Sequence, residues 1–77
     1  MNLSQTRKHI KYIITAINSP DETIQTRFFQ LGFNEGSFIW LKRKAPIFGD
    51  PMLFEIGESQ VALTKLEAGF IEVTVEE

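Results

Sequence analysis

The side chains that can perform acid–base chemistry are few and scattered in this 77-residue chain. It has one histidine, His9, and no cysteine, which excludes thiol catalysis, disulfides and thiolate metal sites. Asp21 and Glu22 belong to a predicted helix start, and Asp50 belongs to a predicted turn. Since no nucleophile is recognisably paired with a base, we expect that the chain is not an enzyme and has no catalytic residues.

Metal binding would depend on the same few side chains. One histidine and scattered glutamates do not provide the ligand spacing of a zinc or iron site, so we expect no resident metal or other cofactor. One alternative stays open, an intermolecular site for Fe(II) or Zn(II) that uses His9 and a glutamate.

The charge of the chain is nearly balanced, with eight basic and ten acidic residues and a net charge of −2. This balance argues against a nucleic-acid binder that relies on neutralising phosphates. The only dense basic cluster is Lys42, Arg43 and Lys44. Two interpretations of this cluster stay open: a solvated strand end, or a contact with an acidic protein surface or lipid headgroups that added salt would weaken.

Length and hydropathy indicate one domain over residues 1–77, with residues 1–8 loosely ordered. No apolar run is long enough to span a bilayer, and the first residues lack the apolar segment of a signal peptide. We therefore expect a cytoplasmic location.

Alternation of side-chain types predicts the strands. A first strand is predicted over His9–Ile17, where β-branched residues are frequent. The other predicted elements are strands over 37–44, 52–56, 60–63 and 70–75, a turn over 57–59 and a short helical turn over 64–69.

One longer helix is predicted over Pro20–Leu31. Ser19 is the expected N-cap, Pro20 the first helical residue and Glu22 the residue that closes the capping box. Gly32 is the expected left-handed C-cap, after which Phe33 folds back onto Phe28 in a Schellman contact.

About five short strands with one helix after the first predict a mostly β fold. A small barrel is favoured, because closure removes the exposed edges of a short antiparallel sheet. The alternative is an open sheet packed on the helix.

The loop over Ala45–Pro51 contains two prolines and a glycine that hold its shape. Ile47 and Phe48 at its centre either cap the end of the barrel or form an apolar tip that docks on a partner. In the preceding strand, Phe38 and Trp40 share the face opposite to the core. Either residues 1–8 cover these two rings or the rings form an exposed patch for protein contact.

The order of these motifs resembles the ferrous iron transport protein A (FeoA) family. The matching segments extend over about residues 10–73 and are Phe29–Gly36, Ala45-Pro46, Gly49–Pro51, Val61–Leu63 and Glu67-Ala68 leading into Ile71–Val73. Three departures from the family pattern occur: an extra residue in the Ile47-Phe48 position, aromatic rather than polar side chains at Phe38 and Trp40, and Thr64 where a basic residue is common.

The resemblance implies an SH3-like barrel and a small cytosolic adaptor that regulates ferrous iron uptake. Its implied partner is the cytosolic region, with a GTP-binding domain, of a FeoB-type iron permease, so the chain would be peripheral to the membrane through this partner. A homo-oligomer stays open. The same barrel occurs in iron-dependent repressors, so the alternative is a metal-responsive or nucleic-acid-binding module. The residues assigned to partner binding are Phe38, Trp40, Lys42, Arg43, Lys44, Ile47, Phe48, Gly49 and Asp50.

Overall fold

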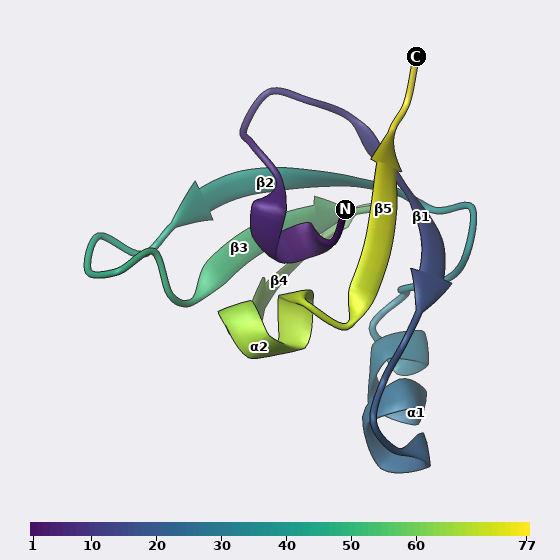
Figure 1. Ribbon diagram of the computed structural model, residues 1–77. Helices are drawn as coiled ribbons and strands as arrows, with labels where there is room; N and C mark the ends of the chain where they lie inside the picture. Colours follow the sequence, from purple (N-terminus) through teal and green to yellow (C-terminus); the bar gives the residue numbers. More distant parts are fainter.

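A five-stranded antiparallel sheet forms most of the molecule, in a computed structural model that describes residues 1–77 (Figure 1). The strand order is β4-β3-β2-β1-β5. The strands are β1 (Tyr12–Ile17), β2 (Phe38–Lys44), β3 (Met52–Ile56), β4 (Ser59–Leu63) and β5 (Ile71–Val75). The helices are the 3-10 turn η1 (Leu3–Gln5), α1 (Glu22–Gln30) and the short α2 (Lys65–Ala68). The predicted mostly β fold with one helix after the first strand is confirmed. No helix is long and apolar enough to cross a membrane.

The sheet bends where β1 meets β2. These two strands share only the registered pairs Tyr12–Ile39 and Ile13–Phe38. In Figure 1, β1 and β5 therefore run at a steep angle to β2 and β3. The bend lets the inward faces of all five strands close around one core of 14 buried residues, which also includes Phe28 and Phe33.

The sequence predicted that the first strand starts at His9, but β1 begins at Tyr12. His9 has a φ of 68°, in the left-handed region, so an extended strand cannot start at this residue. Tyr12 is buried, and its hydroxyl accepts a hydrogen bond from the Arg7 amide at 3.0 Å. The strand therefore starts where the first side chain enters the core.

Helix α1 begins two residues later than predicted, at Glu22. Its N-cap is Asp21, whose Oδ1 accepts a hydrogen bond from the Ile24 amide at 2.9 Å. Ser19 is not the cap, because its hydroxyl instead donates to the Asp21 carbonyl at 3.1 Å. Two cap-type residues compete at this helix start, and the sequence analysis chose the wrong one.

The C-terminal end of α1 has the predicted Schellman geometry. Gly32 has a φ of 94°, and its amide donates to the Phe29 carbonyl at 3.0 Å. The Phe33 amide donates to the Phe28 carbonyl at 2.9 Å, and the two rings meet edge to face with centroids 5.8 Å apart. This contact anchors the helix end to the core, since both rings are fully buried.

The β3–β4 hairpin has a two-residue turn, Gly57-Glu58, so β4 starts at Ser59, one residue earlier than predicted. Gly57 has a φ of 58°, which suits the short turns that connect antiparallel strands. The pairing of β3 with β4 runs without a register shift from Ile56–Ser59 to Met52–Leu63.

The N-terminal segment is folded onto the domain, in contrast to the loosely ordered start that the sequence suggested. Asn2 and Gln5 form a capping box around η1, and Leu3 is fully buried. The Val73 amide in β5 donates to the Met1 carbonyl at 2.9 Å. The segment therefore adds one apolar side chain to the core and covers part of the outer edge of β5.

Replacement of Leu3 by alanine should lower the free energy of unfolding by about 2–5 kcal/mol, because it removes a buried side chain and leaves a cavity. Leu66→Ala is the matched control, since Leu66 is 73% exposed and its loss should change stability by less than about 0.5 kcal/mol. Urea unfolding of both variants measures the difference. Equal stability of the two variants would show that the N-terminal segment is not part of the folded domain.

Candidate docking surface

The loop between β2 and β3 projects from the body of the domain at the C-terminal end of β2 (Figure 1). The Ala45 amide donates to the Pro51 carbonyl at 2.9 Å and closes the base of the loop. Beyond this base, Ile47 is 70% exposed and Phe48 is 87% exposed. The interpretation that these two residues cap the end of the barrel is therefore wrong. We refer to Ile47 and Phe48 as the loop tip.

The backbone of the loop holds the tip in a specific shape. Phe48 and Gly49 are both left-handed, with φ of 61° and 67°. For a bulky residue such as Phe48 this conformation costs about 1–2 kcal/mol. Asp50 fixes the other side of the loop, because its Oδ1 accepts a hydrogen bond from the Lys65 amide at the start of α2, at 3.0 Å. Within the isolated domain, neither the exposed ring nor its strained backbone contributes to stability.

Basic side chains lie around the base of the loop. A Cβ placed on Gly49 would lie 3.4 Å from Lys44 Cδ and 3.7 Å from Lys65 Cε, so both lysine chains flank this glycine. Lys44 and Arg43 are exposed. The sequence analysis found the basic cluster but missed Lys65, which is 16 residues beyond Gly49 and reaches the loop only through the position of α2.

Lys42, the first residue of the predicted basic cluster, points to a different neighbour. Its Nζ lies 3.9 Å from Glu55 Oε2 in β3, in an ion pair that is partly exposed on both sides. A register shift between Leu41 and Arg43 separates Lys42 from the residues nearer the loop. The structure therefore divides the cluster: Lys42 is paired on the sheet, and Arg43 and Lys44 lie toward the loop.

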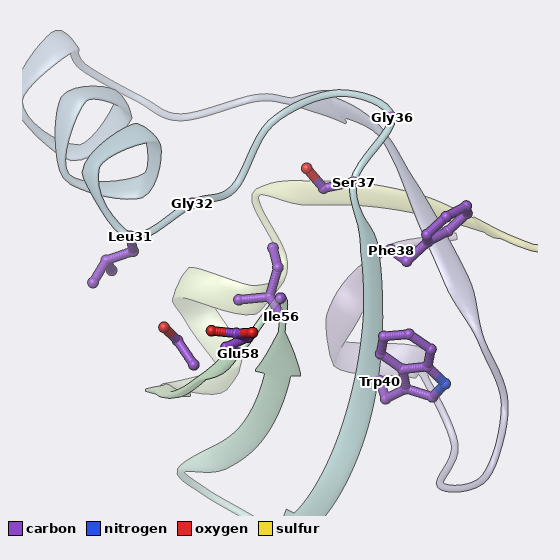
Figure 2. A pocket seen from close by; sticks show the side chains of 10 residues that line it. Leu31, Gly32, Gly36, Ser37, Phe38, Trp40, Ile56 and Glu58 are labelled. Atoms are coloured by element: carbon purple, nitrogen blue, oxygen red, sulfur yellow. The ribbon is translucent and has the colours of Figure 1, made fainter.

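Phe38 and Trp40 project from the same side of β2 (Figure 2). Phe38 is 40% exposed and Trp40 is half-buried. The Lys11 ammonium lies 4.0 Å from the centroid of the Phe38 ring and 5.8 Å from that of Trp40, as a cation–π cover. Of the two interpretations, a partly exposed patch describes this aromatic pair better, with Lys11 as a neighbour that the sequence analysis did not identify.

A hollow of ≈ 470 Å³ lies beside the aromatic pair (Figure 2). It lies between the C-terminal end of α1, the start of β2 and the β3–β4 turn, and Leu31 and Ile56 supply apolar walls. The sequence analysis missed it because its walls come from three separate turns. The only sequence signal is the recurrence of glycine at 32, 36 and 57, each with positive φ.

The predicted contact residues do not form one site. Phe38 and Lys44 are at opposite ends of the seven-residue strand β2, about 20 Å apart at the usual rise per residue. The loop tip with Gly49 and Asp50 lies beyond Lys44. The structure therefore brings these residues together as two surfaces, the loop tip with its basic neighbours and the aromatic pair with its hollow.

The single histidine faces solvent, and no three histidine, cysteine, aspartate or glutamate side chains gather into a group that could hold a metal ion. His9 borders a small surface hollow with Trp40 and Glu55. Glu55 is the one acidic side chain in this hollow, so His9 does not belong to a group of three possible ligands.

Glu67 links α2, which holds the loop through Asp50, to helix α1. Its Oε1 accepts from the Thr64 amide at 3.0 Å, and its Oε2 lies 2.6 Å from Arg27 Nη1 in α1. The hydrogen bond from the Thr64 amide, with smaller contributions from the Thr64 hydroxyl and Arg27, lowers the pKa of Glu67. Thr64, a departure from the family pattern, is here the N-cap of α2 and completes a capping box with Glu67.

With this geometry established, comparison with known proteins identifies the family. The FeoA domain family matches residues 1–75. The chain belongs to the FeoA family. This family is linked to ferrous iron transport and is not a known enzyme family. A search of curated protein sequences gives no match.

Solved structures of FeoA proteins share the fold. The iron(II) transport protein A of Clostridium thermocellum is 32% identical, with a TM-score of 0.88, over 97% of this chain and 45% of that chain. This chain thus spans less than half the length of that protein. A FeoA-like protein of Clostridium acetobutylicum is 27% identical, with a TM-score of 0.84, over 97% of this chain and 85% of that one.

The FeoA protein of Stenotrophomonas maltophilia was solved with zinc and is described as a prokaryotic SH3 domain protein. A role as a ferrous iron transport activating factor has been suggested for it. It is 28% identical to this chain, with a TM-score of 0.84, over 96% of this chain and 89% of that one. The SH3-like fold that the resemblance implied is confirmed. A manganese-dependent transcriptional repressor, 18% identical with a TM-score of 0.83, shares the fold alone.

The lowered pKa of Glu67 predicts a specific loss of stability in acid. The ionised carboxylate stabilises the folded state fully above its ordinary pKa of 4.5, and this contribution disappears as the pH falls through the lower folded-state pKa. Glu67→Gln is the matched variant, because glutamine also closes a capping box but does not titrate. Urea unfolding from neutral pH downward should show a difference between the two proteins that shrinks below pH 4.5. Parallel stability profiles would contradict this assignment.

Phe48→Asn should leave the free energy of unfolding unchanged or raise it by up to about 1–2 kcal/mol, because the ring is exposed and the strain of a bulky residue in the left-handed region is relieved. Asparagine is chosen because it tolerates the left-handed conformation that position 48 requires. Thermal and urea unfolding measure the effect. A large loss of stability would mean that the ring packs on the domain after all.

Proposed function

We propose that this chain is a cytosolic accessory protein that regulates ferrous iron uptake by docking on the cytosolic region of a FeoB-type iron permease. The observation that carries the proposal is the loop tip, two large apolar side chains that are 70% and 87% exposed on a loop tied down at both ends. Membership of the FeoA family, which is linked to ferrous iron transport, supplies the biological context.

The free energies favour a binding role for the tip. An exposed phenylalanine in a left-handed conformation carries a cost in the free protein and gains nothing from intramolecular packing. Burial of the ring in a partner's pocket would recover its transfer free energy, roughly 1.5–3 kcal/mol for a side chain of this size. Because the loop is held by one backbone hydrogen bond at its base and by the bond from the Lys65 amide to the Asp50 side chain, little ordering would be needed on binding.

The basic neighbours of the tip give the contact an electrostatic preference. Arg43, Lys44 and Lys65 are exposed and lie toward or beside the loop, so a partner surface with acidic residues around an apolar pocket fits this region best. Asp50, the acidic residue of the loop, accepts a hydrogen bond from the Lys65 amide. The aromatic pair and its hollow form a second surface that can contact the same permease at the other end of β2.

The alternative function is a metal-responsive regulatory or nucleic-acid-binding module of the repressor type. The likeness to such repressors is one of fold, at 18% identity. A net charge of −2 and only three clustered basic residues argue against a surface that neutralises several phosphates. We therefore favour docking on a protein partner.

The decisive measurement is a titration of the labelled protein with the cytosolic GTP-binding domain of its cognate permease, in GDP and in a GTP analogue. Phe48→Asn should weaken binding by about tenfold or more, the size of effect typical of a buried aromatic anchor. Phe29→Gln is the matched control, because Phe29 is also exposed, at 67%, but lies on α1. This control should bind as the wild type does.

Added salt should weaken the wild-type complex, and Lys44→Ser should reduce this salt dependence. Absence of binding to the isolated domain and to the full-length permease in membrane would overturn the proposed function. Wild-type binding by Phe48→Asn together with lost binding by Trp40→Ser would transfer the contact from the loop tip to the aromatic pair.

A further inference from the structure

The two outer edges of the sheet differ in whether another segment of the chain covers them. The edge strands are β5 and β4. The outer edge of β5 is covered by the N-terminal segment, through the Val73 amide that donates to the Met1 carbonyl and the bridge between Asn2 and Glu72. The free backbone groups of this edge are thus partly satisfied within the molecule.

The outer edge of β4 has no such cover. Strand β4 pairs with β3 on one side, and no hydrogen bond outside this ladder involves residues 59–63. Gln60 and Ala62 are exposed. Their backbone groups therefore face solvent along the length of the strand.

The geometry of the hairpin determines which groups point outward. In a two-residue hairpin the residues that flank the turn, here Ile56 and Ser59, form a hydrogen-bonded pair. Hydrogen-bonded and non-hydrogen-bonded pairs then alternate along an antiparallel ladder, so Val61 and Leu63 bond to β3. The amides and carbonyls of Gln60 and Ala62 consequently point away from β3.

Strand β4 also lacks the features that usually prevent edge-to-edge pairing. Between Ser59 and Leu63 there is no charged residue and no proline, and the ladder with β3 is free of bulges. The β1–β5 and β2–β3 ladders, in contrast, each contain a register shift. A regular, uncharged and open edge is a template for an added strand.

We propose that β4 pairs with β4 of a second copy of this chain, antiparallel and centred on Val61, to form a symmetric dimer with a continuous sheet. In this register Gln60 lies opposite Ala62 of the second copy. By the two-fold symmetry, Ala62 lies opposite Gln60 of the second copy. Both residues present their amide and carbonyl outward, so each pair can exchange two hydrogen bonds. Within residues 59–63, this register pairs every outward-facing amide and carbonyl with one of the second copy.

The charged residues that flank β4 favour a second copy in antiparallel orientation. Glu58 precedes β4 and Lys65 follows it. Antiparallel pairing centred on Val61 places Glu58 opposite the uncharged Thr64 of the second copy, so no like charges face each other there. Parallel pairing in register would instead place each charge next to its own counterpart, which is unfavourable.

The size of the contact predicts a weak dimer. A strand of five residues offers a small buried area compared with that of stable protein interfaces. We therefore expect a monomer–dimer equilibrium that depends on protein concentration. The proposal is independent of permease docking, because the loop tip takes no part in it and Phe48→Asn should dimerise as the wild type does.

Sedimentation equilibrium of the purified chain over a wide concentration range tests the proposal. Ala62→Pro is the sharpest variant, because the Ala62 amide points outward and a proline there removes no bond to β3. We expect the wild-type chain to dimerise and Ala62→Pro to be monomeric at every concentration. Urea unfolding of Ala62→Pro that matches that of the wild-type monomer would show that the variant is folded.

A pair of charge variants tests the register without a change to the backbone. Gln60→Lys combined with Ala62→Lys sets like charges opposite each other across the proposed interface and should abolish the dimer. Gln60→Lys combined with Ala62→Glu sets opposite charges there and should restore it. Thr74→Lys, at an exposed position on β5, is the matched control and should dimerise normally.

A wild-type chain that stays monomeric up to about 1 mM would overturn the proposal. So would a dimer that persists in both Ala62→Pro and the like-charge variant. Failure of the opposite-charge variant to dimerise would overturn the proposed register. Loss of permease binding with an unchanged dimer would refute the proposed function alone, so the two ideas fail separately.

Discussion

Burial of one apolar core of 14 residues is the constraint on which the rest of this molecule depends. A chain of 77 residues without disulfides has little other source of stability, so the side chains of this core must face inward. The bend between β1 and β2 satisfies this requirement, because it turns the inward faces of the strands toward each other. Even the first residues of the chain contribute, through Leu3. Single exposed apolar side chains such as Leu66 and Phe29 are common in folded proteins, so the loop tip stands out through its left-handed backbone as well as its exposure.

The loop and the helices form one connected structure through α2. Glu67 receives hydrogen bonds from Thr64 and pairs with Arg27 of α1, and the Lys65 amide donates to Asp50 in the loop. A four-residue helix therefore joins two segments that are distant in sequence, the loop and α1. Because these are polar contacts at the surface, each is modest in energy, but together they determine where the loop projects.

Local signals in the sequence were sufficient for much of the fold. The Gly32 cap and the Phe28–Phe33 contact were predicted because a Schellman motif is encoded by adjacent residues. The start of α1 was placed wrongly because Ser19 and Asp21 both fit a cap, and in the structure Asp21 accepts the helix amide while Ser19 bonds to the Asp21 carbonyl. The position of Lys11 over Phe38 and that of Lys65 beside Gly49 depend on strand pairing and on α2, which no local pattern specifies.

The same limit applies to the candidate surfaces. Phe38, Trp40, Ile47 and Phe48 stood out in the sequence because their type did not suit their predicted positions. Whether such residues share one site depends on distance along β2, which separates them into two surfaces. The exposure of the loop tip could not be settled from sequence, because an apolar loop residue at a barrel end packs inward or projects outward according to the length and closure of the loop.

The two proposed contacts have a geometric consequence when they are combined. Each loop precedes β3 at the end of the sheet where Met52 pairs with Leu63. A two-fold axis through Val61 reverses the strand direction between copies, so the two loop tips of a dimer would project from opposite ends of the joined sheet. The two tips would be separated by the length of the joined sheet. Pairing through β4 would therefore favour the linking of two separate partners over a stronger attachment to a single one.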